Sequence, residues 1–196
     1  MINPVEIINF SVIEPAISAK AFEIHYKQHY LQYVNKLNVL IADTIFDSLS
    51  VEQIINNSEK GGEIYNNATQ VWNHERFFEQ FTGQSHWYFR GSVYKKYNVY
   101  IPSIPNLLAE ASSKLFGSGY IWLVAAYNTS TQRFNILVQC FKNSQTPIED
   151  ETLIPLICID MWEHSYYLDY QSYKIDYIEN LFDKIDWSVI VNRIPK

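Results

Sequence analysis

Asp160-Met161-Trp162-Glu163-His164 follows directly on the apolar run Leu153 to Ile159 and ends it with a carboxylate and an imidazole four residues apart. On a helix or a tight turn, this spacing directs both side chains toward one point. A carboxylate at the end of a buried strand is also costly unless it is paired or coordinated. One Asp and one His are too few to hold a metal, and His25 and His74 are candidates for the missing ligands. Three imidazoles and one carboxylate would form a mononuclear transition-metal site with a position left for a small substrate.

The first half of the chain has the pattern of helices. Ser18 is a suitable N-cap for a long amphipathic segment from Ala19 to Phe46. Ser50-Val51-Glu52-Gln53 resembles a capping box and predicts a short helix, and a third helix is expected from Ile64 to about Phe81. Two long helices joined in this way can pack as an antiparallel hairpin.

The second half mixes helix and strand. Thr82-Gly83-Gln84-Ser85 is the best boundary, which predicts domains at residues 1–83 and 84–196, although residues 84 to 103 show no clear period. The expected elements are a helix at Asn106–Phe116, strands at Tyr120–Tyr127, Arg133–Phe141 and Leu153–Ile159, and helix again within Tyr166–Ile194. We therefore predict an α+β fold: an antiparallel α-helical hairpin, then an α/β domain with a three-stranded antiparallel sheet, and a metal between the two.

Composition limits the classes of function. The chain has 196 residues and a net charge of −6, which argues against a general nucleic-acid binder. It has no run of about 18 apolar residues that could span a membrane, and its first residues do not form a secretory signal. A cytoplasmic location is therefore expected. Cys140 and Cys158 both lie in apolar contexts, so we expect two buried thiols.

The upstream histidines have simpler interpretations when each is taken alone. His25 and His29 lie one helical turn apart and Tyr33 one turn further, so they form a polar stripe on an apolar helix. Such a pair is more often solvated or hydrogen-bonded than metal-bound, and a lone His74 is more often structural. Together with the strand-end Asp/His pair, however, they can converge only at a domain interface. A di-iron carboxylate bundle is excluded, because it would need Glu three positions before its histidines, where this chain has Phe22, Val71 and Met161.

Several runs of residues resemble the iron/manganese superoxide dismutases. The resemblance covers most of the chain, is weak between about Glu79 and Ser103, and is most specific in the last motif. The matching runs are Glu14–Ser18, His25-Tyr26 with His29 and Tyr33, Asn66–His74, Phe116–Gly119, Trp122–Val124 and Asp160–Tyr170.

The resemblance implies an activity and a ligand set. Two superoxide anions would be converted to dioxygen and hydrogen peroxide by alternate reduction and oxidation of one bound iron, with protons delivered through metal-bound solvent. The ligands would be His25, His74, Asp160 and His164. A catalytically silent scaffold with the same fold is the remaining alternative.

The resemblance also implies roles for residues around the metal. His29 and Tyr33 would flank the substrate entrance, and the Gln70 amide would contact the metal-bound solvent. The active form would be a homodimer, in which Glu163 reaches the partner subunit's His164 and Tyr167 bonds to the partner subunit's His29.

The choice of metal depends on the position of one glutamine. Iron-type members supply it from the first domain, where this chain has Gln70. In manganese-type members this glutamine comes from the second domain, at the position that aligns with Ser144 in this chain. If the alignment is shifted by one residue, the position falls on Gln145, which is then the alternative to Gln70. We predict iron, with manganese possible.

The chain also departs from the family pattern. Tyr120 replaces a frequent Trp, and Lys174 stands where many members have Arg. Because the substrate is an anion and the net charge is negative, any attraction must be local, with Lys27 and Lys174 as candidates.

Overall fold

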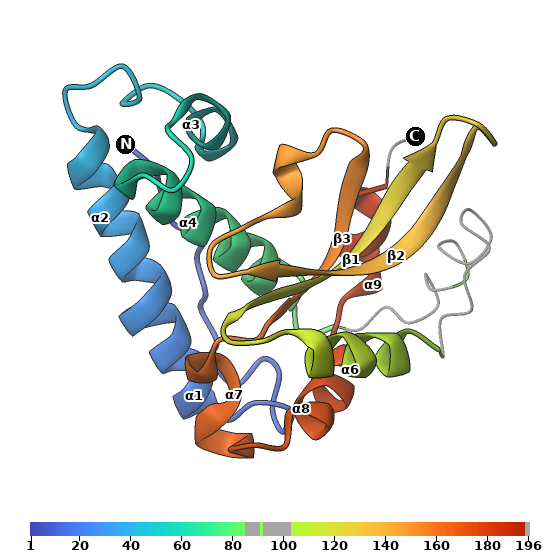
Figure 1. The fold of residues 1–196 in the computed structure, drawn as a ribbon. Helices are drawn as coiled ribbons and strands as arrows, with labels where there is room; N and C mark the ends of the chain where they lie inside the picture. The colour runs from blue at the N-terminus through green and yellow to red at the C-terminus, as the bar shows by residue number, and fades with distance from the viewer. Residues whose placement is uncertain (85–90, 92–102, 195–196) are drawn as a thin grey trace.

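A computed structural model describes residues 1–84, 91 and 103–194 (Figure 1). A helical N-terminal region lies beside an α/β region with a three-stranded antiparallel sheet, which confirms the predicted fold class. Most of residues 84 to 103, where the sequence shows no clear period, lie outside the described part. The boundary between residues 83 and 84 stays a prediction.

The first helix begins where the sequence predicts but changes type along its length. Ser18 is its N-cap and accepts a hydrogen bond from the Ala21 backbone N–H at 3.2 Å. Three segments follow without a break: α1 (Ala19–Ile24), the π-helical η1 (His25–Tyr30) and α2 (Leu31–Ile41). The π-helical segment was not predicted.

The first helix also ends earlier than predicted, at Ile41 rather than Phe46. Ala42 leaves the helical region with a ψ of 133°, and Asp43 adopts a φ of 57°. An aspartate can take this left-handed conformation more readily than most residues, so it suits the turn that stops the helix.

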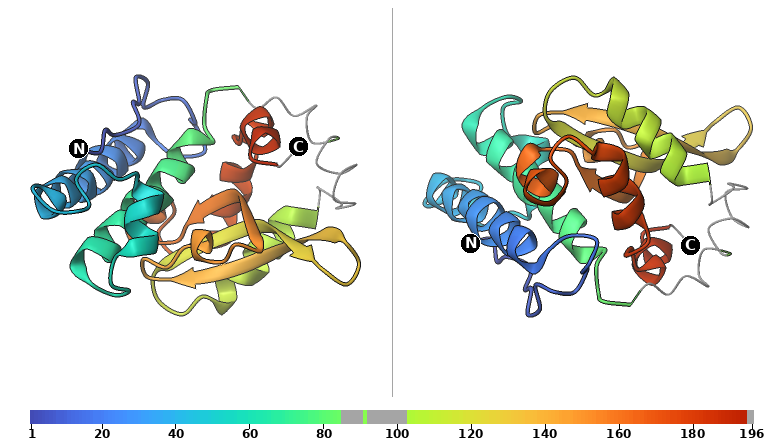
Figure 2. Two further views of the ribbon diagram at one scale, coloured as in Figure 1. Left: turned by 90° about the horizontal axis from the view of Figure 1, so that it is seen from above. Right: turned by 90° about the horizontal axis from the view of Figure 1, so that it is seen from below.

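Two helices complete the N-terminal region. The capping box is present at the start of α3 (Val51–Asn57), because the side chains of Ser50 and Gln53 bond to each other's backbone N–H groups. The long helix α4 (Glu63–Glu79) then runs back along α2. Figure 2 shows α4 between α2 and the sheet, so α4 joins the two regions.

The sheet has the order β2-β1-β3, with both pairs antiparallel. Its strands are β1 (Gly119–Asn128), β2 (Arg133–Lys142) and β3 (Leu153–Asp160). The central strand β1 is buried from Gly119 to Ala125, whereas exposed and part-buried residues alternate along most of the edge strand β2. Cys140 lies on this edge strand and is exposed, so the prediction of two buried thiols is wrong for Cys140 and confirmed for Cys158.

Helices cover the sheet and complete the chain. α6 (Ile104–Lys114) packs against β1 and β2. The C-terminal region is divided into α7 (Glu163–Tyr170), α8 (Lys174–Phe182) and α9 (Trp187–Asn192). Gln171 separates the first two with a φ of 49°, a left-handed turn that the sequence pattern did not reveal. No helix in the described ranges is long and apolar enough to cross a membrane.

Polar side chains, one of them buried and one part-buried, fix the two regions against each other. The Gln80 side chain donates to the Cys158 carbonyl at 2.6 Å and accepts from the Cys158 N–H at 3.1 Å. The Arg193 guanidinium donates to the carbonyls of Leu156 and Arg76 at 2.7 and 2.9 Å. These bonds hold the last part of β3 against α4, which sets the distance between the groups that each element carries.

Candidate metal centre

Four side chains from four separate elements converge between the two regions. His25 lies at the start of η1, His74 within α4, Asp160 at the end of β3 and His164 in the first turn of α7. One potential ligand atom from each lies within 4.8 Å of all the others. His25, His74 and Asp160 are buried, and the His164 side chain is 13% exposed.

The Nε2 atoms of the three imidazoles all lie close to the same carboxylate oxygen. Asp160 Oδ2 lies 3.1 Å from the Nε2 atom of His25, 3.5 Å from that of His164 and 3.8 Å from that of His74. None of these four buried atoms makes a hydrogen bond within the described part of the chain. Four unpaired polar atoms that face one another away from water would be costly without a common partner. A metal ion would provide that partner, so the residues present fit one.

Hydrogen bonds behind the ligands set their orientation. His74 Nδ1 lies 2.7 Å from the Gln70 carbonyl, which can only accept, so Nδ1 carries the proton and Nε2 directs its lone pair to the centre. Asp160 Oδ1 accepts from the Trp162 N–H at 2.8 Å. This leaves Oδ2 of Asp160 as the free acceptor.

The protonation states also suit a metal site. Burial lowers the pKa of His25 and brings that of His74 to about 3, so both imidazoles are neutral at ordinary pH. Burial alone would raise the pKa of Asp160, but the neighbouring His164 and His25 outweigh it and hold this pKa well below its usual range. Neutral imidazoles and an ionised carboxylate are the forms that bind metal.

Aromatic rings enclose the inner side of the centre. The rings of Phe77 and Phe78 each lie 5.0 Å from that of His25, between centroids, and Tyr30 stacks on His74 at 6.1 Å. These rings form a largely apolar wall against His25 and His74.

Comparison with known proteins agrees with this geometry. Residues 8–82 match the alpha-hairpin domain of the iron/manganese superoxide dismutases, and residues 92–193 match the C-terminal domain of the same family. The chain belongs to the iron/manganese superoxide dismutases. It is 32% identical over 193 residues to an iron superoxide dismutase of Plasmodium falciparum, covering 95% of this chain and 92% of the relative. Identity to the iron superoxide dismutase of Escherichia coli strain K12 is also 32%, over 185 residues, covering 93% and 92%.

The surroundings of Gln70 differ from those of Ser144 and Gln145, the other two candidates for the glutamine position of this dismutase family. Gln70 Oε1 accepts a hydrogen bond of 2.5 Å from the Tyr120 hydroxyl, which also lies 3.3 Å from His74 Nδ1. Gln145 also lines the cavity described below, but its Oε1 accepts from the Lys142 N–H at 3.2 Å. Ser144 Oγ donates to Asn66 Oδ1 at 3.0 Å. Of the three candidates, only Gln70 contacts the surroundings of a ligand through its side chain.

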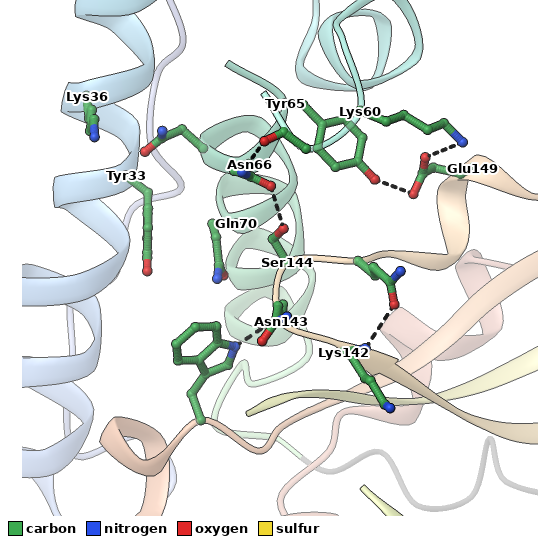
Figure 3. A pocket seen from close by; sticks show the side chains of 14 residues that line it. Tyr33, Lys36, Lys60, Tyr65, Asn66, Gln70, Lys142, Asn143, Ser144 and Glu149 are labelled. Atoms are coloured by element: carbon green, nitrogen blue, oxygen red, sulfur yellow. Dashed lines mark hydrogen bonds and ion pairs between the residues drawn. The ribbon is translucent and has the colours of Figure 1, made fainter. Parts of the chain in front are cut away.

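A cavity of about 840 Å³ lies beside the centre and is lined by neighbours of the ligands rather than by the ligands themselves (Figure 3). The side chains of Tyr33 and Gln70 line this cavity (Figure 3), and the Tyr33 ring lies 5.5 Å from that of His74. Burial raises the pKa of Tyr33, so its hydroxyl keeps its proton. Trp162 also lines the cavity and stacks on His164 at 5.9 Å.

Three lysines line the same cavity, and two of them are neutralised. Lys36 pairs with Glu63 at 2.7 Å and Lys60 with Glu149 at 2.8 Å. Lys142 forms no ion pair with any residue that the structure describes, so it is the free cation of the cavity.

The two lysines that the sequence suggested lie elsewhere. Lys27 pairs with Glu23 at 2.8 Å, and Lys174 lies over the Tyr166 ring at 5.8 Å. Neither lines this cavity. Lys142 was missed because its importance depends on the absence of a nearby carboxylate, which sequence spacing does not show.

The other predicted residues lie on the far side of His164. His29 stacks on the His164 ring at 3.9 Å, and burial, followed by the nearby His164 and His25, lowers the pKa of His29 to about 4. Glu163 and Tyr167 are exposed and line a second cavity, of about 390 Å³, next to His164. These positions leave both side chains free to meet a partner.

Proposed function

We propose that this chain is an iron-dependent superoxide dismutase whose metal is held by His25, His74, Asp160 and His164. The observation that supports the proposal best is the set of four unpaired atoms that face one another in a buried site. Two superoxide anions and two protons would give dioxygen and hydrogen peroxide.

His25, His74, Asp160 and His164 would hold the metal, which would supply the redox couple needed to oxidise one superoxide anion and reduce the next. Imidazoles with one carboxylate suit iron or manganese, whereas zinc has no redox chemistry. Iron is supported by Gln70, whose Oε1 bonds to Tyr120 beside His74, whereas the Oε1 of Gln145 bonds to the Lys142 backbone N–H. Manganese stays the alternative.

The residues of the cavity would bring the anion and the protons to the centre. Lys142 places a positive charge beside the opening of a chain with a net charge of −6. The Tyr33 hydroxyl holds a proton at the inner end, and the Gln70 amide offers N–H groups there. His29 lies behind His164, where it can support the ring orientation and take part in proton supply.

A homodimer is the second part of the proposal. Glu163 and Tyr167 would contact the partner across a surface that also includes Leu168, and Tyr167 and Leu168 are 52% and 56% exposed. Large apolar side chains exposed together often mark an interface. A cytoplasmic location stays a prediction.

The activity is tested by superoxide consumption with the purified protein loaded separately with iron and with manganese. Iron-loaded protein should dismutate, and His74→Ala should fall to background. Equal, low rates in both proteins would favour a catalytically silent scaffold, and activity confined to the manganese form would overturn the choice of metal.

The dimer is tested by sedimentation of Glu163→Ala, with the exposed Glu179→Ala as a control for charge. We expect Glu163→Ala to weaken both dimerisation and metal retention, while the control keeps both. If Glu163→Ala behaves like the control, Glu163 does not bridge the subunits.

A further inference from the structure

Glu149 meets two donors from the helical region where it lines the cavity (Figure 3). It is the last residue of the short helix η4 (Pro147–Glu149), in the connection from β2 to β3. Its Oε2 accepts a hydrogen bond of 2.5 Å from the Tyr65 hydroxyl, and its Oε1 pairs with Lys60 Nζ at 2.8 Å. Each carboxylate oxygen therefore has a donor of its own.

The surroundings of this carboxylate have the features of an oxyanion site. An ammonium and a hydroxyl converge on the two oxygens of one group, and charge-assisted bonds of this kind are the strong ones. Burial and the bond to Glu149 raise the pKa of Tyr65 well above its usual range, so the hydroxyl keeps the proton that it donates. The Glu149 side chain is only 18% exposed, whereas Lys60 is 76% exposed and reaches in from the surface. The carboxylate of the chain thus fills a place that suits a free oxyanion.

The connection that carries Glu149 has other bonds to α4. Ser144 Oγ donates to Asn66 Oδ1 at 3.0 Å. The Asn73 side chain donates to the Ser144 and Gln145 carbonyls at 3.3 and 3.2 Å. We therefore expect this wall of the cavity to keep its place when the Glu149 carboxylate is removed.

A second carboxylate near the same cavity differs in one respect. Glu63 pairs with Lys36 at 2.7 Å, and both side chains are more than half exposed. Among the residues that the structure describes, no hydroxyl donates to Glu63. This is an ordinary surface ion pair, a kind that contributes little. The donor pair of an ammonium and a phenol is therefore a feature of Glu149 and not of Glu63.

We propose that Glu149 is a specificity-determining residue: its carboxylate occupies the donors of Lys60 and Tyr65 and so prevents small oxyanions, such as sulfate, from binding in the cavity. Because Glu149 is tethered to the fold, it competes at a high effective concentration. The inference rests on the proposed function, which assigns this cavity to superoxide. A second anion held there would repel the substrate.

The test follows thermal unfolding of the metal-free protein in sodium sulfate, compared with sodium chloride of equal ionic strength. Glu149→Ala frees both donors, and about 10 mM sulfate should raise its Tm by about 3 °C, the shift for a Kd of about 1 mM. The wild type should not respond, since its donors are occupied. Glu63→Ala is the matched control: it makes the same change in net charge and frees Lys36, which lines the same cavity, but it should not respond either.

Two further variants identify the donors. In the Glu149→Ala background, Tyr65→Phe and Lys60→Gln should each remove most of the response to sulfate. An equal response in the wild type or in Glu63→Ala, or no response in Glu149→Ala, would overturn the inference. If Glu149→Ala does not fold, Glu149→Ser decides by the same criteria, because its short side chain cannot replace both carboxylate oxygens.

The iron-loaded protein tests the consequence for the substrate. In Glu149→Ala, sulfate at about ten times its Kd should raise the KM for superoxide about tenfold at an unchanged kcat, as a competing anion does. The wild type should keep its KM. A response of Tm without a rise in KM would contradict the role in specificity. Iron-loaded wild type that does not dismutate would disprove the proposed function, whereas unfolding of the metal-free protein would still test whether Glu149 occupies the two donors.

Discussion

The helical region and the sheet region each contribute two ligands, but they hold them differently. His25 and His74 lie inside long continuous helices, whose backbone hydrogen bonds fix them on both sides. Asp160 is the last residue of β3 and His164 lies in the first turn of α7, so side-chain hydrogen bonds add to the backbone bonds where the two elements meet. The Asp160 carbonyl accepts from Ser165 Oγ at 2.7 Å and from the Tyr177 hydroxyl at 2.9 Å. The helical half of the centre is therefore held inside continuous helices, whereas the half from the sheet region lies at the ends of two elements and gains bonds from individual side chains.

Removal of one ligand from each half should have the largest effect. His74→Ala and His164→Ala should both lose iron and fall to background activity. In the metal-free state they should differ, because His74 is fully buried and its removal leaves a cavity, whereas His164 borders solvent. We expect His74→Ala to be less stable than His164→Ala by roughly 2 kcal/mol. Urea unfolding with metal analysis checks this, and equal stabilities would contradict the contrast between the halves.

Removal of the metal from the wild-type protein should loosen one half more than the other. A ligand that binds only the folded state stabilises it, so chelation should lower Tm by about 10 °C. Hydrogen exchange should then accelerate more at residues 160–165 than around His25 and His74. Uniform acceleration would show that the helices need the metal as much as the strand end does.

Loss of a bond at the strand end should have a moderate effect. Ser165→Ala removes the donor to the Asp160 carbonyl and should cost about 1 to 2 kcal/mol, since Ser165 is buried and the acceptor loses one of its partners. Ser113→Ala is the control, because Ser113 Oγ makes a similar bond of 2.7 Å to the Glu110 carbonyl on an exposed helix face. Thermal unfolding should show a clearly larger loss for Ser165→Ala; equal losses would mean that the strand end needs no special support.

The sequence predicted what local patterns can encode. The N-cap at Ser18, the capping box at Ser50 and the three strands follow from short-range patterns, and so does the pairing of Asp160 with His164, whereas the full set of four ligands came from the family resemblance. The π-helical segment at His25 was missed, because it changes the number of residues per turn without a change in hydrophobic pattern.

Contacts between segments that are far apart in the sequence were also not predicted. The bond from Tyr120 to Gln70 spans 50 residues, so neither local pattern indicates it. Cys140 was expected to be buried from its apolar neighbours, but its strand lies at the sheet edge, a fact of strand order rather than of sequence context. Spacing predicts which residues can meet, whereas topology determines what surrounds them.

The smallest expected effect concerns the charges of the cavity, where the two halves differ again. The lysines from the helical region, Lys36 and Lys60, are neutralised by glutamates, whereas Lys142 at the end of β2 is not paired within the described residues. Lys142→Gln should lower kcat/KM about twofold at low ionic strength, because attraction of the anion weakens. The loss should fade well above 0.1 M salt, where screening acts within about 10 Å.

Lys114→Gln makes the same change in net charge at a lysine that pairs with Glu110 and does not line the cavity. It should leave kcat/KM unchanged at every ionic strength. Equal losses in both variants would mean that the anion responds to total charge. A loss confined to Lys142→Gln would show that the local attraction for the substrate comes from the sheet region. The same region also contributes Asp160 and His164 to the candidate metal site.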